Sequence, residues 1–250
     1  MLIWIPILLL ALIGALFVLR EYATRVSYNY PRYTNRQYVY GKLKGPKPGD
    51  PAPDFEAQDT EGNRVRLSDF SGKIVVLTTG SGSCPMYACT QTDFNALAQR
   101  YSDDAVFINL YVREAHPGDD FPHHETLEQK VEHARLTKSE EEDDRLMLVD
   151  GLDGAIHTQY GTWPNMAYII DKDGIVRLKH KWADPAAVEL ALDRLQKGEP
   201  IDDIRYEFRK PPETLTKRIF ARACKGAVSD FVLSMPGLPY HMWDAKHSQE

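Results

Sequence analysis

The chain has 250 residues, a formal net charge of −6 and 43% hydrophobic residues. This length allows one sizeable hydrophobic core with additional segments around it. The mild negative charge, without a basic cluster near the cysteine stretch at residues 78–89, argues against nucleic acid as a partner. Three cysteines are too few for a disulfide-stapled secreted scaffold. Composition therefore excludes the nucleic-acid-binding and disulfide-rich classes.

The first segment predicts a membrane anchor. Residues 2–19 carry no charged side chain, and as a helix they would rise ~27 Å, close to the hydrocarbon thickness of a bilayer. No basic residue precedes the apolar run and no small-residue cleavage site follows it, which favours a retained single-pass span over residues 1–21 and not a signal peptide. Residues 22–50 are then a juxtamembrane linker. Four arginines follow the span, so the positive-inside rule predicts a cytoplasmic globular domain.

A cysteine follows the first strongly apolar strand. The run Ile74–Leu77 predicts a buried strand, and small residues then form a tight turn before Cys84 and Pro85. Helically spaced apolar positions predict one helix over residues 85–101. Pro85 suits the first helical position, so Cys84 is expected at the N-cap, where unpaired N–H groups and the helix dipole stabilise a thiolate. We therefore predict that Cys84 is a redox nucleophile; the competing interpretation is a small buried hydrophobe.

The remaining elements predict an α/β domain over residues 51–197. Strands are expected at 105–112, 146–149, 167–170 and 175–178, and helices at 125–137, 153–160 and 185–195. This order predicts a central mixed sheet with helices on both faces. The cysteine turn after a central strand resembles the thioredoxin-like fold, which places Pro164 at that fold's cis proline. Residues 198–250 form a C-terminal extension with an expected helix over 213–233.

Two motifs carry a family resemblance. They are Gly80-Ser81-Gly82-Ser83-Cys84-Pro85-Met86-Tyr87 and Tyr111-Val112-Arg113-Glu114-Ala115-His116-Pro117-Gly118-Asp119. Residues 124–128 and 168–174 support them. Together these stretches resemble the iodothyronine deiodinase family, with Cys84 where the vertebrate enzymes carry selenocysteine. The similarity covers residues 51–195.

The resemblance implies a membrane-bound thiol oxidoreductase that removes iodine from an aromatic ring. Beside Cys84 it implies catalytic roles for Glu114 and His116, with supporting residues Ser81, Ser83, Tyr111, His124 and Pro164. Glu114 and His116 occupy alternate positions after a strand, so both are expected to point to one side. A carboxylate beside a histidine raises its pKa, which suits a proton donor. The implied partners are a small-molecule substrate, with a halogenated aromatic as the candidate, and an external thiol reductant in place of a bound cofactor; a homodimer is left open.

Two other functions remain open from the sequence. Cys89 could act as a resolving cysteine in a peroxiredoxin-like or thiol-disulfide reductase reaction. Five helical residues climb ~7.5 Å and bridged Cα atoms lie within about 7 Å, so a Cys84–Cys89 disulfide requires the first turn to unwind. The other alternative is a non-catalytic membrane-tethered scaffold. No metal site is expected, because the two cysteines lack the usual zinc-ligand spacing.

Overall fold

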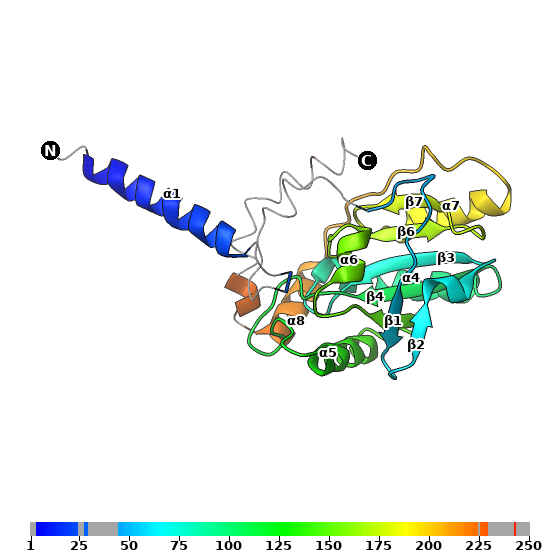
Figure 1. The fold of residues 1–250 in the computed structure, drawn as a ribbon, viewed down its shortest axis with the longest axis horizontal. Helices are drawn as coiled ribbons and strands as arrows, with labels where there is room; N and C mark the ends of the chain where they lie inside the picture. Colours follow the sequence, from blue (N-terminus) through cyan, green and yellow to red (C-terminus); the bar gives the residue numbers. More distant parts are fainter. Residues whose placement is uncertain (1–3, 25–27, 30–44, 225, 230–242, 244–250) are drawn as a thin grey trace.

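A mixed β-sheet forms the centre of the domain. The computed structural model describes residues 4–24, 28–29, 45–224, 226–229 and 243. Seven strands pair in the order β2-β1-β5-β4-β3-β6-β7 (Figure 1). Their bounds are β1 Glu56–Asp59, β2 Arg64–Arg66, β3 Ile74–Gly80, β4 Ala105–Tyr111, β5 Leu146–Val149, β6 Ala167–Ile170 and β7 Val176–His180. Strands β3, β4 and β5 are parallel, whereas β6 and β7 on one side and β1 and β2 on the other pair antiparallel.

Helices cover both faces of this sheet. They are α3 Pro85–Ala88, α4 Gln91–Arg100, α5 Leu127–Glu140, α6 Ala155–Tyr160, α7 Pro185–Gln196, α8 Glu213–Ala223 and the 3₁₀ helix η1 Leu67–Phe70. Side chains of α4 and α7 pack with alternate residues of β3, β4 and β6, and α5 packs on the same face of β4 and β5. Helix α6 and η1 pack on the opposite face. The predicted thioredoxin-like α/β architecture is confirmed.

The helix predicted over residues 85–101 is divided in two. α3 ends at Ala88, and α4 begins at Gln91. The Thr90 N–H, the Thr90 hydroxyl and the Gln91 side-chain amide all donate to the Tyr87 carbonyl, which in a continuous α-helix would accept the Gln91 N–H. The prediction of one continuous helix is wrong for this reason. Phe94 and Leu97 are nevertheless buried, as the helical spacing predicts.

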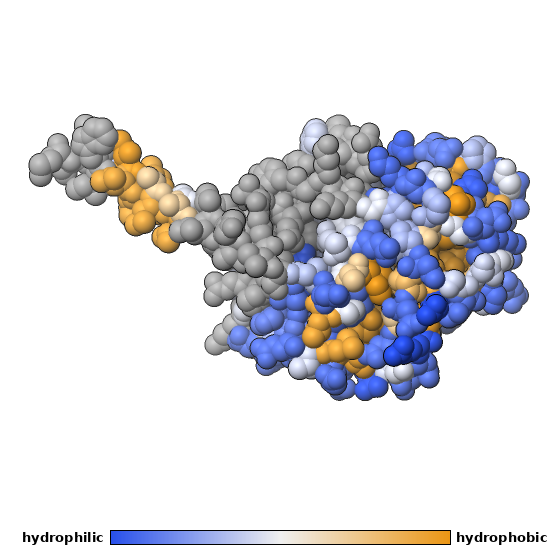
Figure 2. Space-filling view, in the orientation of Figure 1, coloured by the Kyte–Doolittle hydropathy of each residue, from blue (hydrophilic) through white to orange (hydrophobic). Residues whose placement is uncertain are grey.

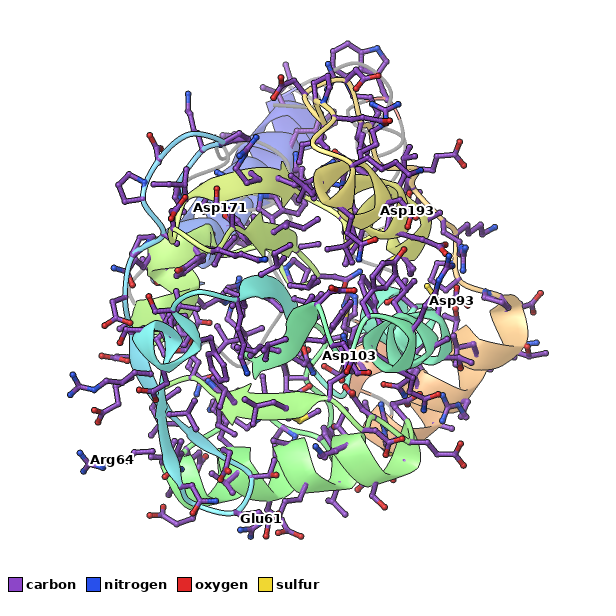
Figure 3. All side chains as sticks on the ribbon, turned by 90° about the vertical axis from the view of Figure 1, so that its right-hand side faces the viewer. Glu61, Arg64, Asp93, Asp103, Asp171 and Asp193 are labelled. Atoms are coloured by element: carbon purple, nitrogen blue, oxygen red, sulfur yellow. The ribbon has the colours of Figure 1, made fainter. Side chains whose placement is uncertain are left out.

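The C-terminal segment packs against the domain. Ile201 and Ile204 are buried with residues of α7. Helix α8 then lies against α3, where its residues Ile219, Phe220 and Ala223 join Ala88 and Phe121 in one apolar cluster. The helix expected over 213–233 is interrupted at Cys224, which adopts a left-handed φ of 68°; residues 226–229 are helical again, and residues 230–233 lie outside the described part of the chain. Figure 3 labels Asp93 of α4, which pairs at 2.6 Å with Arg209 of the segment leading to α8.

Helix α1 (Trp4–Thr24) extends away from the domain (Figure 1). Its described side chains form an exposed apolar stretch (Figure 2), with large hydrophobics at Ile7, Leu8, Leu9, Leu10, Leu12, Ile13 and Leu16. Among the residues that could be searched, no helix combines the length and the apolarity that a membrane crossing demands. The membrane span predicted over residues 1–21 is therefore not confirmed. Most of the linker predicted over residues 22–50 lies outside the described residues.

Candidate active site

Cys84 lies in the loop after the C-terminal end of β3. It is the N-cap of α3, and Pro85 occupies the first helical position, as the sequence predicts. Its side chain is 2% exposed and packs against Tyr87 and Ala115. Burial raises the pKa of the Cys84 thiol to about 12, although the N–H groups of Tyr87 and Met86 act in the opposite direction. The expectation of a stabilised thiolate is wrong for this arrangement, because one helical turn does not offset the loss of solvent.

The segment after β4 is hydrogen-bonded to the Cys84 loop. Ser81 Oγ accepts from the Ala115 N–H at 3.1 Å, and Ser83 Oγ accepts from the His116 N–H at 3.0 Å. Ser83 in turn donates its N–H and its hydroxyl to Glu114 Oε2, at 2.8 and 2.6 Å. The two sequence motifs therefore meet in space, and Ser81 and Ser83 are the side chains that join them.

Glu114 is the centre of a buried polar network. The Tyr111 hydroxyl donates to Glu114 Oε1, and His124 Nε2 lies 3.2 Å from the same oxygen. Burial by itself would raise the pKa of Glu114, but His124, Ser83 and Tyr111 outweigh it and hold that pKa at about 2. Glu114 is therefore ionised at neutral pH. Burial and the neighbouring carboxylate raise the pKa of Tyr111 well above its usual value, so the phenol stays protonated.

His116 differs from its expected role. Strand β4 ends at Tyr111, so the alternation rule of an extended strand does not extend to Glu114 and His116. The imidazole of His116 instead meets the edge of Phe220 of α8, with ring centroids 5.8 Å apart. Burial lowers its pKa to about 4 and outweighs the opposing influence of Glu114. The prediction of a raised pKa is wrong, and the imidazole is neutral at pH 7.

The peptide bond before Pro164 is trans, since no cis peptide occurs among the described residues. The expected cis proline is thus wrong. The turn is held by Thr79, whose hydroxyl donates to the Trp163 carbonyl at 3.2 Å and accepts from the Met166 N–H at 2.8 Å. These bonds hold the Trp163–Met166 turn beside β3.

Cys89 lies at the C-cap of α3, five residues after Cys84, and is half-buried. Its thiol donates to the Met86 carbonyl at 3.2 Å. Burial raises the pKa of Cys89 to about 11, with Arg209 acting in the opposite direction. Both cysteines are free thiols in this structure.

Three residues of this region are missing from the sequence-based site. His133 of α5 places Nδ1 3.9 Å from Glu114 Oε1. Arg222 of α8 donates to the Gly82 carbonyl and pairs with Glu140 and Glu141, while Phe220 contacts His116. His133 has one sequence signal, since it follows Val131 and precedes Ala134 on the buried face of α5. The α8 residues have none, because they lie more than 100 positions from the loop they touch.

The cysteine loop at the end of β3, in a sheet of this topology, defines a thioredoxin-like thiol protein. The AhpC/TSA family matches residues 48–179, and the chain belongs to this family. The protein is therefore an oxidoreductase, as the sequence predicts.

Comparison with curated proteins gives more particular relatives. The chain is 31% identical to the thyroxine 5-deiodinase of Gallus gallus over 140 residues, which are 51% of this chain and 54% of the relative. It is 30% identical to that of Sparus aurata over 146 residues, 54% of each chain. The chain thus spans about half the length of the curated relatives it matches. The expected relationship to deiodinases is confirmed.

Two solved structures share the fold. An uncharacterised conserved protein from Geobacillus kaustophilus aligns with a TM-score of 0.54 and 21% identity, covering 64% of this chain and 87% of that one. A hypothetical protein from Sinorhizobium meliloti aligns with a TM-score of 0.54 and 16% identity, covering 66% and 92%. At these identities the similarity concerns the fold alone.

Proposed function

We propose that this protein is a thiol-dependent reductive dehalogenase of iodinated aromatic compounds, with Cys84 as the nucleophile. The observation that carries the proposal is the union of the two motifs in space: the Cys84 loop is hydrogen-bonded through Ser83 to the ionised Glu114. The relationship to thyroxine 5-deiodinases supplies the substrate class.

The reaction balances with two external thiols and no bound cofactor. Cys84 gives its proton to the buried polar network, and the thiolate attacks iodine, so that an S–I bond forms and the C–I bond breaks. The electron pair of the C–I bond remains on the ring carbon, which takes up a proton. A first external thiol then displaces iodide from sulfur and forms a mixed disulfide with Cys84. A second thiol releases Cys84 and leaves as the oxidised disulfide, having supplied two electrons with the first.

Proton supply is assigned to the buried network and not to an imidazolium at His116. Glu114 is ionised and His116 is neutral, so neither holds an acidic proton at pH 7. His124 Nε2 lies 3.2 Å from Glu114 Oε1, so the His124 ring belongs to this network. Ser83 and Tyr111 orient the carboxylate, and they serve as positioning residues in this mechanism.

A second reaction is favoured by the position of Cys89. In it, the Cys84 thiolate takes one oxygen from a hydroperoxide, which leaves as the alcohol, and Cys89 attacks the resulting sulfenic acid and expels water. The disulfide so formed is reduced by external thiol. Helix α3 has only four residues and ends at Ala88, with Cys89 as its C-cap, so bridging requires a single turn to unwind. Membership of the AhpC/TSA family supports this alternative.

One experiment separates the two reactions. The full chain, purified in mild detergent, is incubated with an iodinated phenol and dithiothreitol, and in parallel with hydrogen peroxide. Iodide release is followed together with the oxidation state of each cysteine, in the native protein, Cys84→Ser and Cys89→Ser. We expect iodide release that disappears in Cys84→Ser and persists in Cys89→Ser.

Other outcomes would replace the proposal. Peroxide-driven bridging of Cys84 and Cys89 without iodide release would establish the second reaction. A Cys84 that responds in neither arm would leave the non-catalytic scaffold. Equal iodide release by native protein and Cys84→Ser would refute a role for the thiol.

We further propose that α1 anchors the protein in a membrane with the domain on the cytoplasmic side. The described side chains of α1 are apolar around the helix, a distribution that suits lipid and not water. The full chain is expected in the membrane pellet after alkaline extraction, and Leu9→Arg with Leu12→Arg is expected to release it. A native chain that stays in the supernatant would rule out the anchor. The homodimer that the sequence leaves open stays a prediction.

A further inference from the structure

Two histidines face Glu114: His133 of α5, and His124 of the segment before that helix. One ligand atom from each of Glu114, His124 and His133 lies within 4.8 Å of the other two. His124 Nε2 is 3.2 Å from Glu114 Oε1, and His133 Nδ1 is 3.9 Å from it. All three side chains are buried. Tetrahedral ligands ~2.1 Å from an ion stand about 3.4 Å apart, and the two measured separations bracket that value.

The two histidine nitrogens have little else to bind. Within the described residues, neither His124 Nε2 nor His133 Nδ1 has a hydrogen-bond partner of proper geometry, although both atoms are buried. Buried polar atoms without such partners are rare and call for an explanation. Hydrogen bonding to Glu114 cannot supply one for His133, because 3.9 Å is beyond hydrogen-bond reach. An ion between the three groups satisfies both nitrogens at once.

The surroundings hold the three groups in place. Ser83 fixes the carboxylate through two hydrogen bonds to Oε2, the oxygen that is not shared with the histidines. The His133 ring stacks on Phe121 with centroids 4.2 Å apart and an interplanar angle of 25°. Such outer contacts orient metal ligands in proteins.

We propose that Glu114, His124 and His133 bind one divalent transition-metal ion of the Zn²⁺ or Fe²⁺ type. Two imidazoles and one carboxylate suit these ions, and three protein ligands leave a position for water. The sequence offers no cysteine spacing for such a site, and it is the histidine on α5 that completes it. The inference goes beyond the proposed dehalogenation, because that reaction is written without a bound ion.

Metal binding is tested without reference to activity. The full chain is stripped with a chelator, returned to buffer with a non-coordinating phosphine reductant, and titrated with Zn²⁺ in a calorimeter. We expect one Zn²⁺ per chain, affinity about a hundredfold lower in His133→Ala and in His133→Gln, and unchanged affinity in the neighbouring His123→Ala. A variant with all three cysteines changed to Ser is expected to bind as the native chain does.

Several results would overturn the site. These are the absence of stoichiometric binding by the native chain, undiminished binding by folded His133→Ala, and loss of binding in the cysteine variant. Co²⁺ bound to the native chain gives a test that needs no variant, because a sulfur-to-metal charge-transfer band would assign the ion to the cysteines. We expect a tetrahedral Co²⁺ spectrum without that band. Circular dichroism establishes that each variant is folded.

Discussion

The two sides of the Cys84 loop are unlike. On one side, the segment after β4 holds the loop through the buried carboxylate of Glu114 and the hydroxyls of Ser83 and Tyr111. On the other side, α8 covers it with apolar side chains, among them Phe220, and with the largely buried Arg222, which donates to the Gly82 carbonyl. Hydrogen bonds to a charged group contribute about 1.5–3 kcal/mol each, whereas ion pairs with one exposed partner, such as Arg218–Glu141 and Arg222–Glu140 of the α8 side, contribute about 0–1 kcal/mol.

This difference indicates how Cys84 becomes accessible. If the segment after β4 moved away from the Cys84 loop, the ionised Glu114 would lose its hydrogen-bond donors. If α8 moved away, mainly apolar surface and a few ion pairs would become exposed. Local opening draws on the less costly contacts of a structure. We therefore expect α8 to move and the Glu114 side to stay in place when Cys84 reacts.

The largest expected effect is that of Glu114→Ala. The change removes the acceptor of two Ser83 bonds and one Tyr111 bond inside the protein. We expect the free energy of unfolding to fall by about 3–5 kcal/mol in urea denaturation. Glu125→Ala, an exposed glutamate nearby, is the control and should change it by less than about 0.5 kcal/mol. A loss under about 1 kcal/mol for Glu114→Ala would show that the polar side is no firmer than the α8 side.

The contact between His116 and α8 should appear as a dependence of stability on pH. Burial lowers the pKa of His116 to about 4. As the pH falls below 6.5, His116 is therefore protonated in the unfolded chain while it stays neutral in the folded chain. Stability present at pH 7 is therefore lost as the pH falls, by about 2 kcal/mol at pH 5 for this one group. His116→Phe keeps a ring against Phe220 and should lose that part of the pH dependence, measured as the difference in unfolding free energy between pH 7 and pH 5. Equal slopes in both proteins would mean that His116 titrates in the folded state as it does in water.

A smaller effect is expected where the end of α8 meets Gly118. A Cβ on Gly118 would lie 1.7 Å from the Ala223 carbonyl oxygen, so Gly118→Ala must displace α8. We expect Cys84 to react with iodoacetamide about tenfold faster, which corresponds to docking weakened by ~1.4 kcal/mol. Mass spectrometry identifies the labelled cysteine, and Ala221→Ser on the exposed face of α8 is the control. An unchanged rate in Gly118→Ala would show that Cys84 is reached by another route.

Local sequence patterns predict the secondary structure around Cys84, whereas contacts between residues distant in sequence determine its burial and protonation. The apolar run of β3 and the proline at Pro85 suffice to place Cys84 at an N-cap, because both act within a few residues. The burial that keeps Cys84 protonated comes from Tyr87 and from Ala115, a residue of the distant segment after β4. His133 is recognisable as a ligand only once α5 is known to face Glu114. The break before α4 likewise depends on side chains that compete for the Tyr87 carbonyl, which apolar spacing does not record.

The smallest effect is expected on the outer face of α8. Lys217 pairs with Glu213 at 2.6 Å, one helical turn away, but both side chains are exposed. Lys217→Ala should therefore change the free energy of unfolding by less than about 0.5 kcal/mol. The Cys84 labelling rate should change by no more than the factor to which that free energy corresponds. If α8 is held by its apolar face, the effect of Phe220→Ala on the Cys84 labelling rate must be severalfold larger than that of Lys217→Ala, because Phe220→Ala removes buried contacts with Ala88 and His116. Similar effects of the two changes would mean that helix formation in α8, and not its docking, limits access to Cys84. The contrast between the two sides of the loop would then lie in helix propensity instead of packing.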